Sequence, residues 1–123
     1  MNTLGVLLTD ASHERAHYAL VVATGAAALG RDVTLFATNG GCRLFLRDTS
    51  LCADPREARI AARGVAGIAT LLEAAVELGI RRIACEAGLR AEALDSAPLA
   101  EGVERAGIAT FLEAGGPGQI VSL

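Results

Sequence analysis

Lysine and tryptophan are absent from this 123-residue sequence, and aromatic residues make up only 3% of it. All positive side chains are therefore arginines, scattered along a chain of net charge -3. Nucleic-acid binding needs a concentrated basic face, so we expect no nucleic-acid partner. Arg56, Arg59 and Arg63 recur at helical spacing near Asp54 and Glu57, which indicates a solvated helix face rather than an anion site.

We also expect neither a membrane-spanning segment nor an export signal. The longest helical apolar stretch, 16–29, is shorter than the about 20 residues that a bilayer crossing needs, and it contains His17 and Tyr18. The first residues have no basic region of the kind that begins a signal peptide. We therefore expect a cytoplasmic protein without a membrane partner, and its three cysteines, which form no Cys-x-x-Cys pair, as reduced thiols.

Several cofactor and metal motifs are lacking. The sequence has no G-x-G-x-x-G motif after a strand, no Walker loop and no G-x-S-x-G elbow, so we expect no resident cofactor. His13 and His17 have the i, i+4 spacing of two metal ligands, but no third ligand converges on them, and we expect no metal site. His17 fits a packing role, whereas His13 at a helix start can reach a pocket and supply a proton.

What the sequence does contain is an alternation of strand and helix patterns. Apolar residues form 52% of the chain and are mainly small or aliphatic, which suits helices packed on a parallel sheet. The expected fold is a single α/β domain over 1–123, a three-layer sandwich with a mainly parallel sheet of about five strands and helices on both faces. The predicted strands are 4–9, 32–37, 82–85, 107–112 and 119–122.

The predicted helices lie between these strands. One runs from an N-cap at Ser12 to Gly30, and another covers the apolar positions between 65 and 79. Between 42 and 63 we expect a short helical piece, a loop and a second helix. One or two helical turns are expected around Pro98.

An eight-residue repeat tests this interpretation. Residues 67–74 and 107–114 differ only at Leu71 and Phe111. The first copy continues a helical period, whereas a Gly-Gly-Pro-Gly turn follows the second, so we predict helix for the first and strand for the second. The similarity extends too little to indicate a duplication.

In a parallel sheet, ligands bind beyond the carboxyl ends of the strands. This places the loops 9–13, 38–42, 85–88 and 113–116 around one site. The candidate pocket residues are Asp10, Ser12, His13, Asn39, Gly40, Gly41, Glu86 and Gly88. The glycines at 40 and 41 can admit an anion to backbone N–H groups, although this is a weak signal.

Cys85 is the candidate reactive residue because it ends a strand and begins a turn into a helix. Free N–H groups at a helix start favour a thiolate over a thiol, whereas Glu86 opposes that effect. The alternative is a buried cysteine that only packs. Cys42 follows Gly41 at the same edge, as either a second thiol or a half-buried loop residue, and Cys52 is expected to be structural.

Four segments of the sequence resemble the DsrE-like (DsrE/DsrF/DsrH-like) sulfurtransferase family. These are 17–30, 33–36, 83–85 and 102–107, in the family's order. The resemblance implies an α/β domain that assembles as trimers or hexamers, and a cysteine at a strand end that holds a persulfide. Cys85 matches that position. The sequence departs from the family's relay proteins around 39–42 and after Cys85.

The leading hypothesis is therefore a sulfur carrier or sulfurtransferase that acts through a Cys85 persulfide, with thiol or persulfide proteins as donor and acceptor. A non-catalytic module that binds a small anion or nucleotide-like ligand is an alternative, as is a subunit of a larger assembly. A redox sensor that forms a Cys42–Cys85 disulfide is a further alternative. Self-association is also expected because the stretch 64–78 has few charges and leaves an apolar face.

Overall fold

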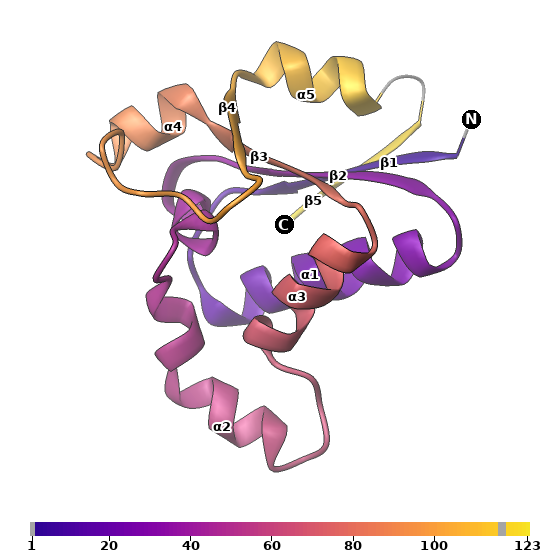
Figure 1. Cartoon of the computed structure of the whole chain (residues 1–123), viewed down its shortest axis with the longest axis vertical. Helices are drawn as coiled ribbons and strands as arrows, with labels where there is room; N and C mark the ends of the chain where they lie inside the picture. Colours follow the sequence, from indigo (N-terminus) through magenta and orange to yellow (C-terminus); the bar gives the residue numbers. More distant parts are fainter. Residues whose placement is uncertain (1, 116–117) are drawn as a thin grey trace.

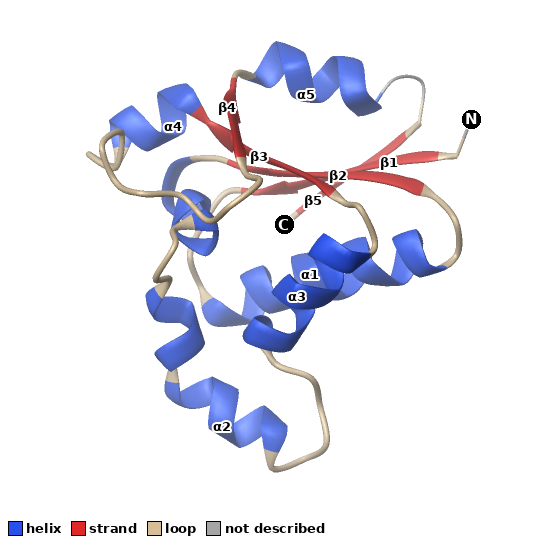
Figure 2. Ribbon diagram, in the orientation of Figure 1, coloured by secondary structure: helices blue, strands red, loops and turns tan. Residues whose placement is uncertain are grey.

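The computed structural model describes residues 2–115 and 118–123. Five strands form one parallel sheet in the order β4-β3-β2-β1-β5. The strands are β1 (Thr3–Leu8), β2 (Asp32–Ala37), β3 (Arg81–Cys85), β4 (Glu104–Ala106) and β5 (Gln119–Ser122). Helices lie on both sides of this sheet, so the predicted three-layer α/β fold is confirmed (Figures 1 and 2).

The larger core lies between the sheet and α1 (His13–Ala28), which packs against α3 (Ile68–Glu77). Leu4, Val6 and Leu8 alternate along β1 toward this core and are almost fully buried. Ser12 caps α1, because its hydroxyl accepts a hydrogen bond from the Arg15 N–H. Sequence periodicity predicted α1 and β2 correctly because both have continuous apolar faces.

The opposite face of the sheet is covered by α4 (Glu86–Ala91) and α5 (Ile108–Gly115) (Figure 1). Its smaller core consists of Phe36, Ile83, Cys85 and Phe111. The rings of Phe36 and Phe111 stack with their centroids 4.8 Å apart. Two of the aromatic residues thus lie in this smaller core, whereas Phe45 lies in the larger core and Tyr18 is exposed.

The prediction of a strand at 107–112 is wrong, because this segment forms α5. The apolar residues Ile108, Phe111 and Leu112 have helical spacing, and the neighbouring Ala109, Glu113 and Ala114 favour helix. The fourth strand is instead the three-residue β4, immediately before the repeat. Both copies of the repeat are thus helical, and α5 ends at Gly115.

Chain segments between β2 and α3 form short helices. These are η1 (Asn39–Phe45), η2 (Ser50–Ala53) and α2 (Pro55–Ala61). α2 has no buried residue and projects from the body of the molecule (Figure 1).

The helical turns expected around Pro98 do not form. The segment pairs instead with the end of η1, where the Arg47 N–H donates to the Pro98 carbonyl at 3.0 Å. The Ala100 N–H in turn donates to the Phe45 carbonyl at 2.9 Å. Among the helices of the described chain, none is long and apolar enough to cross a membrane.

Candidate active site

The carboxyl ends of the parallel strands bring three of the four predicted loops to one edge of the sheet. β1 leads to Thr9, β2 leads to η1, and β3 leads directly into α4. The sequence predicts the fourth loop, 113–116, at this edge only because it predicts a strand over 107–112, and this placement is wrong. Instead, the Gly115 carbonyl accepts a hydrogen bond from the Thr3 hydroxyl at 2.5 Å, which puts the end of α5 at the opposite, amino edge. Gly116 lies outside the described residues.

Cys85 is both the last residue of β3 and the N-cap of α4. Its Sγ accepts a hydrogen bond from the Gly88 N–H at 3.4 Å, and its backbone is extended as an N-cap requires. The residue is 7% exposed and packs against Phe36, Ile83 and Phe111. The fold therefore fixes the sulfur at the start of a helix, with an apolar wall on one side.

Gly88 allows α4 to approach the start of η1. A Cβ atom at this position would meet the backbone nitrogen of Asn39 and lie 2.6 Å from the Thr38 Oγ1. Asn39 itself has a φ of 51°, in the left-handed region that asparagine tolerates better than most residues. Two of the predicted pocket residues, Asn39 and Gly88, are thus brought together by direct backbone packing.

Gly40 and Gly41 follow in η1, close to the end of β1. A Cβ atom on Gly41 would lie 2.5 Å from the Leu8 carbonyl oxygen, so only glycine fits there. Gly40 is less constrained, since a Cβ atom would make ordinary contacts with Asp10 and Ala11. These glycines allow η1 to cross closely over the end of β1.

Cys42 is fully buried in the larger core and donates a hydrogen bond from Sγ to the Ala37 carbonyl at 3.5 Å. Burial raises the pKa of the Cys42 thiol to about 11, and the neighbouring Cys85 sulfur adds to the increase. At neutral pH Cys42 is therefore a neutral thiol. All three cysteines are free, and Cys52, unlike the other two, is exposed.

Asp10 and Ser12 both serve the start of α1. The Ser12 N–H donates to Asp10 Oδ1 at 2.9 Å and lowers the pKa of that carboxyl. Asp10 also accepts from Arg15 at 3.2 Å in an exposed ion pair. The side chains of Asp10 and Ser12 thus form hydrogen bonds at the start of α1.

His13 contacts α2 and lies on the face of the sheet opposite to Cys85. Its Nε2 is 2.6 Å from the Glu57 carboxylate, which also accepts the Ile68 N–H at 2.7 Å. The His13 ring stacks on His17, whose Nε2 donates to the Ala66 carbonyl. Glu57, the centre of this cluster, is not predicted from the sequence, since its separation of 44 residues from His13 leaves no local pattern.

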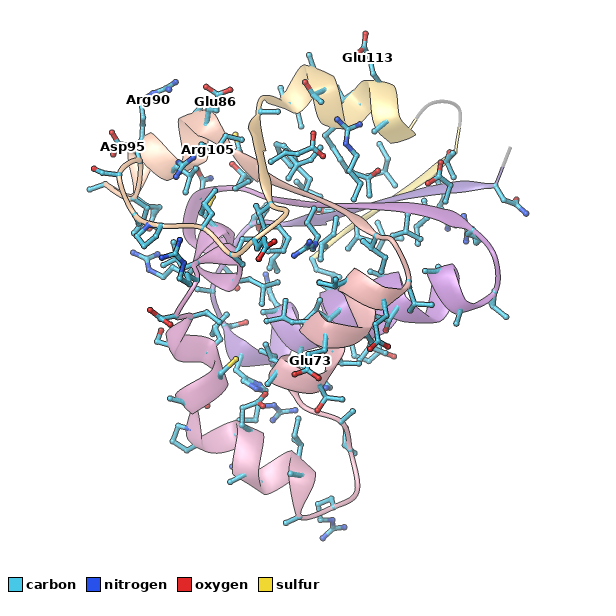
Figure 3. All side chains as sticks on the ribbon, in the orientation of Figure 1. Glu73, Glu86, Arg90, Asp95, Arg105 and Glu113 are labelled. Carbon is cyan, nitrogen blue, oxygen red and sulfur yellow. The ribbon has the colours of Figure 1, made fainter. Side chains whose placement is uncertain are left out.

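A small cavity of about 150 Å³ adjoins the first turn of α4. It is lined by Glu86, Leu89, Arg90, Asp95 and Arg105. Figure 3 shows Glu86 and Arg90 on the outer side of α4. Arg105 donates to the carbonyls of Asp95 and Ala97, which ties the loop after α4 to β4. Within the described residues, no cluster of three potential metal ligands is present.

Both the sequence and the fold of the chain are similar to those of known proteins. Residues 3–118 match the model of the DsrE/DsrF-like family. The fold is similar to the crystal structure of the YchN protein from E. coli, with a TM-score of 0.77 and 16% sequence identity over 100% of both chains. It is also similar to MTH1491 from Methanobacterium thermoautotrophicum, a protein of unknown function, with a TM-score of 0.62 and 16% identity over 100% of both chains. No curated protein matches the sequence.

Proposed function

The chain belongs to the DsrE/DsrF-like family, and from this premise we propose that it carries sulfane sulfur as a persulfide on Cys85. The family is linked to sulfur relay. The observation that carries the proposal is the position of Cys85 at the carboxyl edge, where Sγ accepts the Gly88 N–H at the start of α4. A sulfur atom that is held in one place and contacts a backbone donor is suited to nucleophilic chemistry.

The proposed reaction consists of two exchange steps that balance without an external oxidant. The Cys85 thiolate attacks the outer sulfur of a donor persulfide, R-S-SH. The new bond gives Cys85-S-SH, the donor S–S bond breaks, and the donor leaves as the thiolate R-S⁻. An acceptor thiolate then attacks the outer sulfur on Cys85, which leaves as a thiolate again. The donor and acceptor are proposed to be thiol or persulfide proteins.

The state of Cys42 supports a single sulfur-carrying residue. A thiol whose pKa is raised to about 11 is rarely ionised at neutral pH, so Cys42 is a poor attacking group. Its Sγ is also held by the Ala37 carbonyl within the larger core. These features favour the persulfide carrier over a sensor that cycles through a Cys42–Cys85 disulfide.

Intact mass spectrometry after incubation with a low-molecular-weight persulfide tests the proposal. In a Cys52→Ser background, which removes the exposed thiol, the protein and its Cys42→Ser variant are expected to gain one sulfur atom, and its Cys85→Ser variant is expected to gain none. Reduction should remove the added sulfur. Persulfide formation that survives in Cys85→Ser, or its absence from the folded wild type, would overturn the assignment to Cys85.

A further inference from the structure

A cavity of about 610 Å³ lies on the α3 side of the sheet, away from the side chain of Cys85. It exists because the helices cover this face unevenly. α1 packs on β1 and β2, and α3 packs on α1, so neither helix covers β3 fully. The segments around Phe45 and Ala100, which pair with each other, enclose the space instead.

The wall of this cavity is mainly apolar. Ala69, Leu72 and Val76 contribute a stripe along α3, and Leu44 and Phe45 contribute the buried wall from η1. The volume falls in the range of roughly 300–1,000 Å³ typical of small-molecule sites, which combine apolar walls with a few polar groups. The cavity is therefore large enough for a small ligand and offers apolar walls to part of it, while Ala69 and Val76 leave it open to solvent.

Arg82 is the polar group that the sheet contributes to this cavity. Its Nη2 donates to the Glu101 carbonyl at 3.2 Å. Its Nε is buried and has no hydrogen-bond partner among the described residues. No carboxylate of the described chain pairs with Arg82, and burial lowers the pKa of its guanidinium. Because this Nε has almost no accessible surface, a ligand in the cavity can meet only the terminal nitrogens of the guanidinium, of which Nη2 forms an exposed hydrogen bond.

The other charged groups around the cavity are exposed. They are Arg47, Asp48, Glu73 and Glu101, and Figure 3 shows Glu73 on α3. Water and salt screen exposed charges much more than partly buried ones. Arg82 is therefore the least exposed charged group of the cavity, whose lining also includes Arg47 and three exposed carboxylates.

From these features we propose that the cavity binds an apolar carboxylate, with the carboxylate on Arg82 and the hydrocarbon against α3 and η1. A guanidinium and a carboxylate form charge-assisted hydrogen bonds, which are about twice as strong as neutral ones. The hydrocarbon part replaces water along the apolar walls. The site is separate from the proposed sulfur chemistry and does not depend on it.

Cys52 provides a built-in reporter of occupancy. It lines the cavity and is exposed, whereas Cys42 and Cys85 are buried. A ligand in the cavity is expected to slow alkylation of Cys52 by iodoacetamide, which peptide mass spectrometry measures residue by residue. The readout does not require any sulfur-transfer activity.

Decanoate, with decan-1-ol as the uncharged control, is the probe, and both are used below the concentration at which they aggregate. Calorimetry and protection of Cys52 are expected to show decanoate binding about tenfold tighter than decan-1-ol, which is the size of one charge-assisted hydrogen bond. Equal binding of the two compounds, or no binding of decanoate, would overturn the proposal.

Two variants and one control locate the site. Arg82→Gln should abolish the preference for decanoate, whereas Arg81→Gln should keep it, because Arg81 pairs with Glu104 outside the cavity. Ala69→Phe should block both compounds by filling the space from the exposed side of α3, with little risk to folding. Undiminished decanoate binding in either Arg82→Gln or Ala69→Phe would rule out this cavity as the site.

Discussion

The two buried cysteines have different surroundings, and these set their chemistry. Cys85 packs in the small core under α5 and accepts a backbone N–H, whereas Cys42 lies in the larger core and donates to a carbonyl. A thiol that donates a hydrogen bond is stabilised in its protonated form. The two neighbouring cysteines thus have different roles. Cys85 is the candidate nucleophile, and Cys42 packs in the core as a neutral thiol.

The raised pKa of Cys42 predicts a loss of stability at alkaline pH. The folded state holds the Cys42 proton more tightly than the unfolded state, whose pKa is near 9.0, so the associated stabilisation is complete below that value. It is lost as the pH rises through about 11. Urea unfolding between these values should show a steeper decline for the wild type than for Cys42→Ala. Because lysine is absent, few other groups titrate in this range. Parallel declines would contradict the assignment.

Gly88→Ala is expected to destabilise the protein by about 1–3 kcal/mol, because the new methyl group overlaps the backbone of Asn39. Gly25→Ala is the matched control, since no atom beyond its chain neighbours and the local backbone of α1 lies within 4 Å of its Cβ position. Alanine there should stabilise the helix by about 0.5–1 kcal/mol. Chemical denaturation measures the change in the free energy of unfolding for both variants. The same change in Gly88→Ala and Gly25→Ala would show that α4 and η1 have room for a methyl group between them.

At the scale of elements, Glu57 connects three helices. Its carboxylate on α2 receives the Ile68 N–H at the start of α3 and contacts His13 at the start of α1. Gly67, the N-cap of α3, has no side chain to cap the helix, so Glu57 supplies the missing acceptor from another element. Burial opposes ionisation of Glu57, but the Ile68 N–H and His13 outweigh it and lower its pKa.

Glu57→Ala is therefore expected to cost about 1–3 kcal/mol, since it leaves the Ile68 N–H and the His13 ring without their acceptor. Glu77→Ala on the exposed side of α3 should change stability by less than about 0.5 kcal/mol. Because the folded pKa of Glu57 is lowered, its contribution is present above the unfolded value of 4.5 and is lost as the pH falls through the folded pKa. Thermal unfolding at pH 7 and at pH 3 should show the gap between wild type and Glu57→Ala shrinking in acid.

The two copies of the repeat show how one helical sequence is used in two ways. Ile68 of the first copy is fully buried, whereas the equivalent residue of the second copy, Ile108, is 50% exposed. In the second copy Phe111 is the buried residue, and it stacks on Phe36. The two copies differ only by Leu71 in the first and Phe111 in the second, and the two helices bury different faces.

At the scale of the whole molecule, apolar side chains remain exposed on the outer elements. Ile108 and Leu112 are half exposed one turn apart on α5, and Ile120 is 45% exposed on the edge strand β5. An exposed apolar face of this kind supports the proposal of self-association, and the order of a trimer or hexamer is what the resemblance to the DsrE-like family implies.

Sedimentation velocity tests that expectation. The wild type should sediment as a trimer or hexamer, and Leu112→Arg should shift the population toward monomer with an unchanged circular dichroism spectrum, because the side chain is 51% exposed in the single chain. The exposed polar substitution Glu113→Gln serves as control. A monomeric wild type at micromolar concentration would contradict the proposal.

The sequence by itself determined the fold class, α1, β2 and β5, and the position of Cys85 at a strand end. These features follow from local periodicity and capping, which act over a few residues. It misassigned α5, because the following turn outweighed a helical pattern of eight residues. Only the tertiary structure decided the Glu57 cluster, the packing of Gly88 on Asn39 and the cavity beside Arg82. Each joins residues far apart in the chain, and such contacts are fixed by how helices cover the sheet, which leaves no periodic signal in the sequence.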